Sequence, residues 1–370
     1  MQRRIVASLL ALPLLLLAPV SGFAQTAASS NAQQALQWLQ CTQQQATGQI
    51  GSGGNPIARS SEVAIGLAAA GQQASAMHAG AASLADYLKT ATSTDVGTNG
   101  ELLMARASVA DAGPTASVAA QLQAAKGSNG EYGSDIYSDA LAILGLRAAG
   151  QTVADDAVAF LKGQQKASGG WSADNADQYG EDSNTTALAI QALISTGVAS
   201  TDSTITNGFT YLQSVYGGGG FGNSPGAEPD PNSDELAIQA ILAAHLQSDS
   251  SWLTRLDQAL SYLAGQQIAT GADAGAISSS YSKLFATSDA PSAFLQRSLT
   301  ARGVAESVVP LLACPAAAST TATPQPTATT APILAQTGRP FDGRPLFAGL
   351  ALIALALGLI WRPRRRARAS

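Results

Sequence analysis

The chain has 370 residues, a length that suits two domains of ordinary size, and a formal net charge of −5. Hydrophobic residues make up 46% of it and charged residues only 12%, about half the usual charged share. This composition excludes a charge-rich disordered chain and a nucleic-acid-binding protein that works through phosphate contacts.

The chain between its two ends is strongly acidic, because the ends carry much of the positive charge. Residues 1–24 and 339–370 hold nine of the 20 Lys and Arg residues but only one of the 25 acids, Asp342. The rest of the chain therefore carries 11 basic against 24 acidic side chains, a net charge of −13.

Residues 1–24 have the features of a cleavable signal peptide. Arg3 and Arg4 precede an apolar run from Ile5 to Val20, and residues 22–24 (Gly-Phe-Ala) supply the small side chains that a signal peptidase recognises. We expect the mature chain to begin at Gln25 and to be exported. An uncleaved membrane anchor and a twin-arginine signal are the alternatives.

Residues 25–314 are expected to form one domain of six repeats, each about 45 residues long. The first half of a repeat ends in an aromatic residue followed by Leu, as in Phe160-Leu161 and Tyr262-Leu263. The second half is an Ala-rich apolar run, such as residues 187–193. Such runs are typical of helices buried on every side, whereas the first halves are more polar.

This alternation predicts an all-α fold, an (α/α)6 toroid whose polar helices surround the apolar ones. The inner helices are expected to begin after Ser60-Ser61, Ser138-Asp139, Asn184-Thr185 and Ser233-Asp234. An open superhelical solenoid is the alternative. Cys41 and Cys314 favour a closed ring, because an isolated pair of cysteines in an exported protein is expected to form a disulfide.

One stretch of the body resembles a known family motif. Phe160-Leu161-x-x-x-Gln165-x-x-x-Gly169-x-Trp171 is similar to the QW motif of squalene and hopene cyclases, whose α/α toroid is shared with protein prenyltransferases. Partial copies occur at Trp38-Leu39 with Gln43 and Gly48, at Tyr262-Leu263 with Gln267 and Gly271, and at Gly219-Gly220-Phe221. The resemblance implies the fold and says much less about activity.

Residues that the activities of this fold require are missing. The sequence has no Asp-x-Asp-Asp segment, with which terpene cyclases protonate an alkene, and no Gly-Cys-Gly-Glu-Gln thioester motif. A zinc site is not expected, because Cys41, Cys314, His78 and His245 are its only Cys and His residues. We therefore favour a protein that is not an enzyme.

Acidic residues gather where the inner helices are expected to begin, which predicts an acidic mouth on the ring. Carboxylates beside aromatic residues suit sugars or cationic ligands, so we expect a small polar or carbohydrate ligand there. The residues chosen for this site are Asp182, Asp230, Asp234, Glu235, Trp171 and Phe221. Helix capping is the alternative explanation of the acids.

Calcium is the one cofactor that the sequence suggests. Asp230, Asn232 and Asp234 place three oxygen-bearing side chains at alternate positions, as at the start of a calcium loop. The match stops there, because the Gly and the Glu of an EF-hand loop are replaced by Glu235 and Ile241.

The C-terminal part of the chain is expected to be a stalk and an anchor. Residues 315–333 are rich in Pro, Thr and Ala, a composition that cannot bury a core. Residues 334–370 begin with Leu334-Ala335-Gln336-Thr337-Gly338 and continue with a hydrophobic span at 346–361 and an Arg-rich tail.

This order resembles a sortase cell-wall sorting signal of the Leu-Pro-x-Thr-Gly kind, with Ala335 in place of the proline. The resemblance implies cleavage between Thr337 and Gly338, with a sortase and a cell-wall acceptor as partners. The alternative is a tail anchor whose span stays in the membrane and whose basic end stays in the cytoplasm.

Together these features predict an exported protein on the cell surface, anchored to the wall or the membrane. We expect a ligand-binding or adhesive module. An extracellular glycan hydrolase or lyase that uses carboxylates near Asp182 and Asp234 is the first alternative. A surviving terpenoid cyclase or prenyl-transfer activity is the second.

Overall fold

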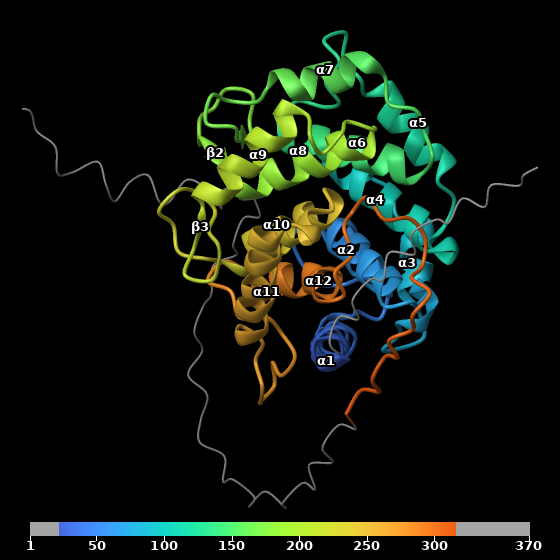
Figure 1. Cartoon of the computed structure of the whole chain (residues 1–370). Helices are drawn as coiled ribbons and strands as arrows, with labels where there is room; N and C mark the ends of the chain where they lie inside the picture. The colour runs from blue at the N-terminus through green and yellow to red at the C-terminus, as the bar shows by residue number, and fades with distance from the viewer. Residues whose placement is uncertain (1–21, 316–370) are drawn as a thin grey trace, which may run out of the picture. The chain divides into compact units, whose positions relative to one another are not determined.

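The computed structural model describes residues 22–315, which form two concentric rings of helices (Figure 1). The outer helices are α1 (Gly22–Trp38), α3 (Leu84–Thr90), α5 (Ala116–Ala124), α7 (Asp155–Gly163), α9 (Ser203–Ser214) and α11 (Ser250–Gly265). The inner helices are α2 (Pro56–Ala69), α4 (Val96–Ser108), α6 (Ile136–Ala148), α8 (Ser183–Ser195), α10 (Pro231–Ala243) and α12 (Lys283–Phe294). The fold is the all-α toroid that the repeats predict.

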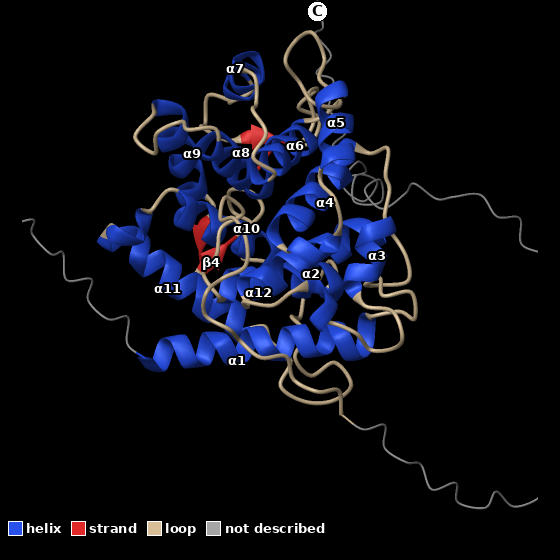
Figure 2. Ribbon diagram, turned by 90° about the vertical axis from the view of Figure 1, so that its right-hand side faces the viewer, coloured by secondary structure: helices blue, strands red, loops and turns tan. Residues whose placement is uncertain are grey.

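The inner ring is closed. Each inner helix packs against the next one along the chain, and α12 packs against α2. Figure 2 shows α12 beside α1 as well, so the last repeat lies on the first. The chain is therefore a ring rather than an open solenoid.

The inner helices run in the same direction, so their N-termini meet at one end of the ring. Asn55, the N-cap of α2, donates a 2.6 Å hydrogen bond from its side chain to Thr98 in the first turn of α4.

Helices α4 and α6 touch through two glycines, Gly100 of α4 and Gly145 of α6. A Cβ at either position would lie 2.5 Å from the backbone of the other helix.

Short hairpins and turns join the helices. Strand β1 (Trp171–Ser172) pairs antiparallel with β2 (Glu181–Asp182), and β3 (Tyr216–Gly217) pairs antiparallel with β4 (Gly220–Phe221). The remaining turns are the π-helical η1 (Leu39–Gln43) and the 3₁₀-helical η2 (Ala74–Ala76), η3 (Ala110–Ala112) and η4 (Leu246–Ser248).

Four inner helices begin earlier than the sequence suggested, at the N-caps Asn55, Asp135, Asp182 and Asp230. Ser60, Asp139 and Asp234, which were expected to cap three of these helices, serve the preceding hairpins instead, and Thr186 and Thr287 do the same in two other repeats. Each accepts the backbone N–H of a buried apolar or aromatic residue. The pairs, hairpin residue first, are Ile50 with Ser60, Tyr132 with Asp139, Trp171 with Thr186, Phe221 with Asp234 and Ile277 with Thr287.

The glutamine of the QW-like motif, Gln165, ties its hairpin to the next outer helix, α9. The side-chain amide of Gln165 donates to the carbonyls of Gly169 and Thr204, at 2.9 and 2.8 Å. Gly169 has a φ of +96°, and a Cβ there would lie 2.2 Å from the carbonyl oxygen of Asn207, so only glycine fits.

The partial copies of this motif use other partners than the sequence suggested. Gln44, not Gln43, bonds the carbonyl of Gly48, because Gln43 ends the π-helical turn. Gln267 bonds Gly275 rather than Gly271.

Residues 295–315, here called the C-terminal strap, cross the end of the ring where the inner helices finish. The backbone N–H groups of Ala305 and Val309 donate to the carbonyls of Ala68 and Ala70 beside the end of α2. The structure contains the expected disulfide between Cys41 and Cys314, which fastens the strap to the first repeat. Among the helices described, none is both long and apolar enough to cross a membrane.

Candidate functional site

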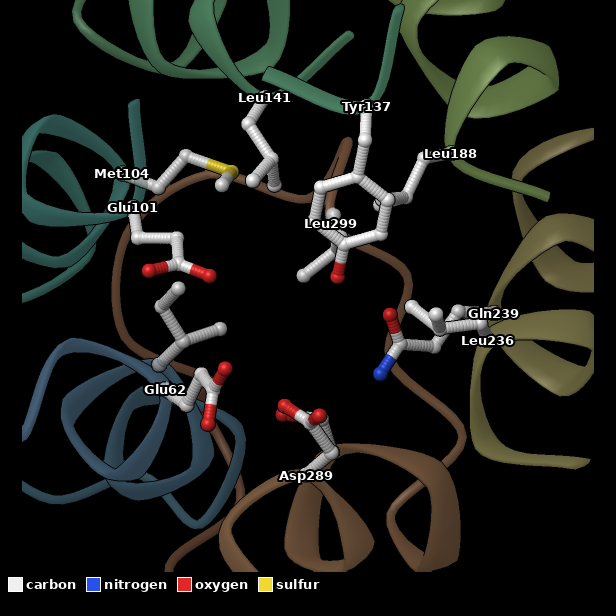
Figure 3. Close-up of a pocket in the computed structure, with 12 residues that line it drawn as sticks. Glu62, Glu101, Met104, Tyr137, Leu141, Leu188, Leu236, Gln239, Asp289 and Leu299 are labelled. Atoms are coloured by element: carbon white, nitrogen blue, oxygen red, sulfur yellow. The ribbon is translucent and has the colours of Figure 1, made fainter. Parts of the chain in front are cut away.

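A cavity lies on the axis of the inner ring (Figure 3). All six inner helices and the strap line it with mixed apolar and acidic side chains. The lining residues are Glu62, Ile65, Glu101, Met104, Tyr137, Leu141, Leu188, Leu236, Gln239, Asp289, Ser292 and Leu299, to which α8 contributes Leu188. None of them is among the site residues expected from the sequence.

Three carboxyl groups point into this cavity. Glu62 comes from α2, Glu101 from α4 and Asp289 from α12, and Figure 3 shows the three along one side of the opening. Each lies near the middle of an inner helix and is the only acid on that helix. Closure of the ring brings them together, since α12 reaches α2 only at the end of the chain.

Arg59 is the cation that faces this group. It lies one turn before Glu62 on α2 and forms a salt bridge with it, and both side chains are about 10% exposed. Its guanidinium stacks over the ring of Phe285, 3.9 Å from the ring centre. Burial opposes its charge, but Glu62, Glu101 and Asp289 together raise the pKa of Arg59.

Burial shifts the carboxyl groups toward their protonated forms. It raises the pKa of Glu101 to about 7 and that of Asp289 to about 6, although Arg59 favours the ionised form of both. Burial also raises the pKa of Glu62 well above its usual value, against the pull of Arg59. At neutral pH the group therefore holds protons that exposed carboxylates would have lost.

Glu235 adds a fourth acid next to this group. It lies on α10, is fully buried, and its two carboxyl oxygens have no hydrogen-bond partner within residues 22–315. Burial raises its pKa well above the usual value, and Asp289, Asp234 and Glu62 add to the shift. Glu235 was expected from the sequence at an acidic mouth on the surface, but it lies in the interior.

Gln239 lies one turn after Glu235 on α10 and points into the cavity (Figure 3). It is 1% exposed, and its side-chain oxygen has no hydrogen-bond partner in the described part of the chain. A buried amide oxygen without a partner costs roughly 1–3 kcal/mol, so this position favours a bound donor.

The cavity is small, at about 30 Å³. This is room for about two water molecules. Leu299 of the strap closes one end of it, and the backbone N–H of Leu299 donates to the side-chain oxygen of Gln191 on α8 at 3.0 Å. The strap therefore limits what the ring can hold.

The other residues chosen from the sequence lie around the hairpins. Asp182 and Asp230 cap α8 and α10, and each also accepts a hydroxyl hydrogen bond, from Thr185 and Ser233. Trp171 and Phe221 are fully buried, so the structure places them in the core and not on an open surface. The pairs Trp171 with Asp182 and Phe221 with Asp234 are adjacent, but they belong to two different repeats.

The calcium candidates do not form a ready site. The Asp230 carboxyl caps α10, and one oxygen of the buried Asp234 accepts the N–H of Phe221 at 2.9 Å. Residues 22–315 contain no group of three or more Asp, Glu, His or Cys side chains placed to hold a metal ion. Calcium binding therefore stays a prediction. Glycan hydrolysis by carboxylates near Asp182 and Asp234 also stays a prediction.

Neither a protein-family model nor a curated protein matches the sequence. Solved structures do match. A variant of the type II terpene cyclase MstE from Scytonema, in complex with geranylgeranyl dihydroxybenzoate, is 13% identical with a TM-score of 0.53, over 74% of this chain and 98% of that one. The apo form of MstE is also 13% identical with a TM-score of 0.53, over 73% of this chain and 98% of that one.

This chain has the fold of the terpene cyclases. An ent-copalyl diphosphate synthase from Streptomyces platensis is also similar, at 15% identity and a TM-score of 0.48, over 67% of this chain and 52% of that one. At these identities the likeness concerns the fold alone. The resemblance stated from the QW-like motif is thus confirmed for the architecture.

Proposed function

We propose that this terpene-cyclase-like toroid is a ligand-binding module of the cell surface, and that the central cavity is where it binds a compact polar or positively charged ligand. One observation carries the proposal. Three carboxyl groups converge on one cavity with the Gln239 oxygen, which has no hydrogen-bond partner within residues 22–315, and Arg59 is the positive charge that opposes them among these residues.

Export and anchoring are part of this proposal, and their support comes from the sequence. The signal peptide at 1–24, the linker at 315–333 and the sorting signal at 334–370 lie almost wholly outside the described residues. Cleavage between Thr337 and Gly338 would leave the toroid on a stalk outside the cell.

Acid-initiated cyclisation of a prenyl chain is a second candidate function. Glu101 favours it, because a carboxyl group with a pKa of about 7 stands beside Met104 and Leu141 in a partly apolar wall. The size of the cavity speaks against it, since about 30 Å³ is far below the volume of a prenyl substrate. The strap would have to leave the ring first.

The test compares ligand-induced stabilisation in matched variants of the mature protein. Thermal melting is recorded with ammonium salts, calcium and amino sugars, for the wild type and for a Glu62→Gln, Asp289→Asn double variant. We expect at least one ligand to raise the melting temperature of the wild type and not of the double variant. Asp257→Asn, an exposed acid on α11, should behave like the wild type. A wild type that no ligand stabilises would refute the proposal.

The cyclase alternative has its own test. The wild type and Leu299→Ala are incubated with geranylgeranyl dihydroxybenzoate, and the products are analysed by mass spectrometry and chromatography. We expect no cyclic product from either protein. A product whose formation requires Glu101 would establish the second candidate.

A further inference from the structure

The charges around the cavity do not balance. The titratable groups that line it are Glu62 on α2, Glu101 on α4, Tyr137 on α6 and Asp289 on α12. Next to them lie Arg59 on α2 and Glu235 on α10, with Asp234 and Asp230 behind Glu235. Helix α8 carries no ionisable side chain. The strap's Arg297 does not reach the carboxyl groups in the structure, because it donates to the backbone of Arg302 and Gly303.

Full ionisation of the four buried carboxyl groups against one guanidinium would leave a charge of −3 in the ring. An enclosed charge of that size is unstable unless protons or another cation neutralise it. Burial holds protons on these groups, so a cation that enters must displace them.

Gln239 indicates that the missing partner is a hydrogen-bond donor. Its oxygen faces the cavity, is buried and has no partner among the described residues. Once ionised, the carboxylates of Glu62, Glu101 and Asp289 are acceptors as well, so they and the Gln239 oxygen would surround a donor held in a volume of about 30 Å³. A small ammonium ion carries both the charge and several N–H donors in about that volume.

We propose that the central cavity binds one small ammonium ion, such as ammonium or methylammonium, and that binding releases a proton from the carboxyl cluster. In that exchange the O–H bond of one carboxylic acid breaks, its proton goes to the solvent, and the resulting carboxylate pairs with the ion. No oxidant or co-reactant is needed. The inference rests on the proposed function, since it names the ligand class of the same cavity.

Isothermal titration calorimetry of the intact mature protein tests this. Ammonium chloride and methylammonium chloride are titrated at constant ionic strength in two buffers of different ionisation enthalpy. We expect release of about one proton per ion, and an affinity that rises up to about tenfold per pH unit between pH 5 and 7. Potassium, which donates no hydrogen bond, and tetramethylammonium, which is larger and has no N–H, should bind at least tenfold more weakly.

Two variants locate the site. Gln239→Leu should weaken ammonium binding at least tenfold, whereas Gln213→Leu, at an exposed position of α9, should leave it unchanged. Circular dichroism melting checks that both variants fold. If Gln239→Leu does not fold, Glu62→Gln takes its place and should remove both binding and proton release.

Several outcomes would overturn the inference. They are the absence of binding heat, binding without proton release, equal affinity for potassium, and unchanged binding in the folded Gln239→Leu variant. If ammonium fails but an amino sugar or calcium stabilises the wild type and not the Glu62→Gln, Asp289→Asn variant, the proposed function stands without this ligand. If no ligand has an effect, both proposals fail.

Discussion

The side-chain amide of Gln267 donates a 2.9 Å hydrogen bond to the backbone carbonyl of Asn31, 236 residues earlier in the chain. The same amide holds the carbonyl of Gly275 at 2.9 Å. Gln165 makes the same two kinds of bond within the ring, to Gly169 and Thr204. The glutamine side chain that joins two neighbouring repeats at Gln165 thus joins the last repeat to the first at Gln267.

Gln267→Ala should lower the free energy of unfolding by roughly 1–3 kcal/mol, because two part-buried carbonyls lose their donor. Urea denaturation measures the change. Gln165→Ala should cost a similar amount, and Gln213→Ala, at an exposed site on α9, should cost little. A negligible effect of Gln267→Ala beside a large effect of Gln165→Ala would mean that this bond does not hold the ring closed.

Asp234 occupies the position that Thr186 and Thr287 occupy in other repeats, as acceptor for a buried hairpin N–H. Its second oxygen has no hydrogen-bond partner within the described part of the chain, and burial raises its pKa well above the usual value. Asp234→Thr keeps the acceptor and removes the ionisable group, so we expect stability equal to or above that of the wild type at pH 7.5. Asp234→Ala should cost roughly 1–3 kcal/mol. Chemical denaturation of the two variants side by side decides whether the bond or the charge matters.

The stability of the ligand-free protein should fall as the pH rises from about 5 to 8. Glu101 has a pKa of about 7 in the fold, against an ordinary value of 4.5, so the folded state binds its proton more tightly than the unfolded state does. That stabilisation is complete below the ordinary pKa and is lost as the pH rises through about 7.

Glu101→Gln should therefore raise the free energy of unfolding by roughly 2–3 kcal/mol at pH 8 and change it little at pH 5. Denaturation curves at the two pH values give the comparison, with Asp257→Asn as the exposed control. Equal effects at both pH values would show that Glu101 does not titrate in this range.

The disulfide should contribute strongly to stability. It joins residues 273 positions apart, and the chain-entropy estimate for such a loop is about 5 kcal/mol, an upper figure because the ring already restrains both ends. Cys314→Ser should lower the melting temperature and expose the strap to proteolysis near Leu299. Alkylation of Cys41 and Cys314 without prior reduction would show that the bridge does not form in the native protein.

Mature protein from the cell wall should end at Thr337 and lack the hydrophobic span at 346–361. The reason is the order of motif, span and basic tail, which serves transfer to a wall acceptor. Mass spectrometry of the wall fraction identifies the C-terminus. An intact chain that extends to Ser370 would place the protein among membrane-anchored proteins instead.

The architecture could be predicted because it repeats. The aromatic-Leu pairs, the Ala-rich runs and the motif around Gln165 recur along the chain, and each copy reports on the same local packing. Helix starts were less predictable, since Ser60 and Asp234 have the chemistry of N-caps but accept from hairpins. A residue type shows what a side chain can bond, and not which neighbour it meets.

The cavity could not be predicted from the sequence for a related reason. Glu62, Glu101 and Asp289 stand one per helix without a shared motif, and only ring closure places them together. A single acid near the middle of an inner helix is the signal that could have found them. The strap gives no such signal, because its contacts are mainly backbone bonds.

The bond between Cys41 and Cys314 also decides where a mechanical load enters the protein. Without it, tension on the chain beyond Cys314 would act first on the strap and could peel Val309 and then Ala305 from the end of α2, one hydrogen bond at a time. With it, the covalent link passes the load to Cys41 in the first repeat, so the strap stays slack. Tension from the chain beyond Cys314 can then reach the ring while Leu299 remains in the cavity.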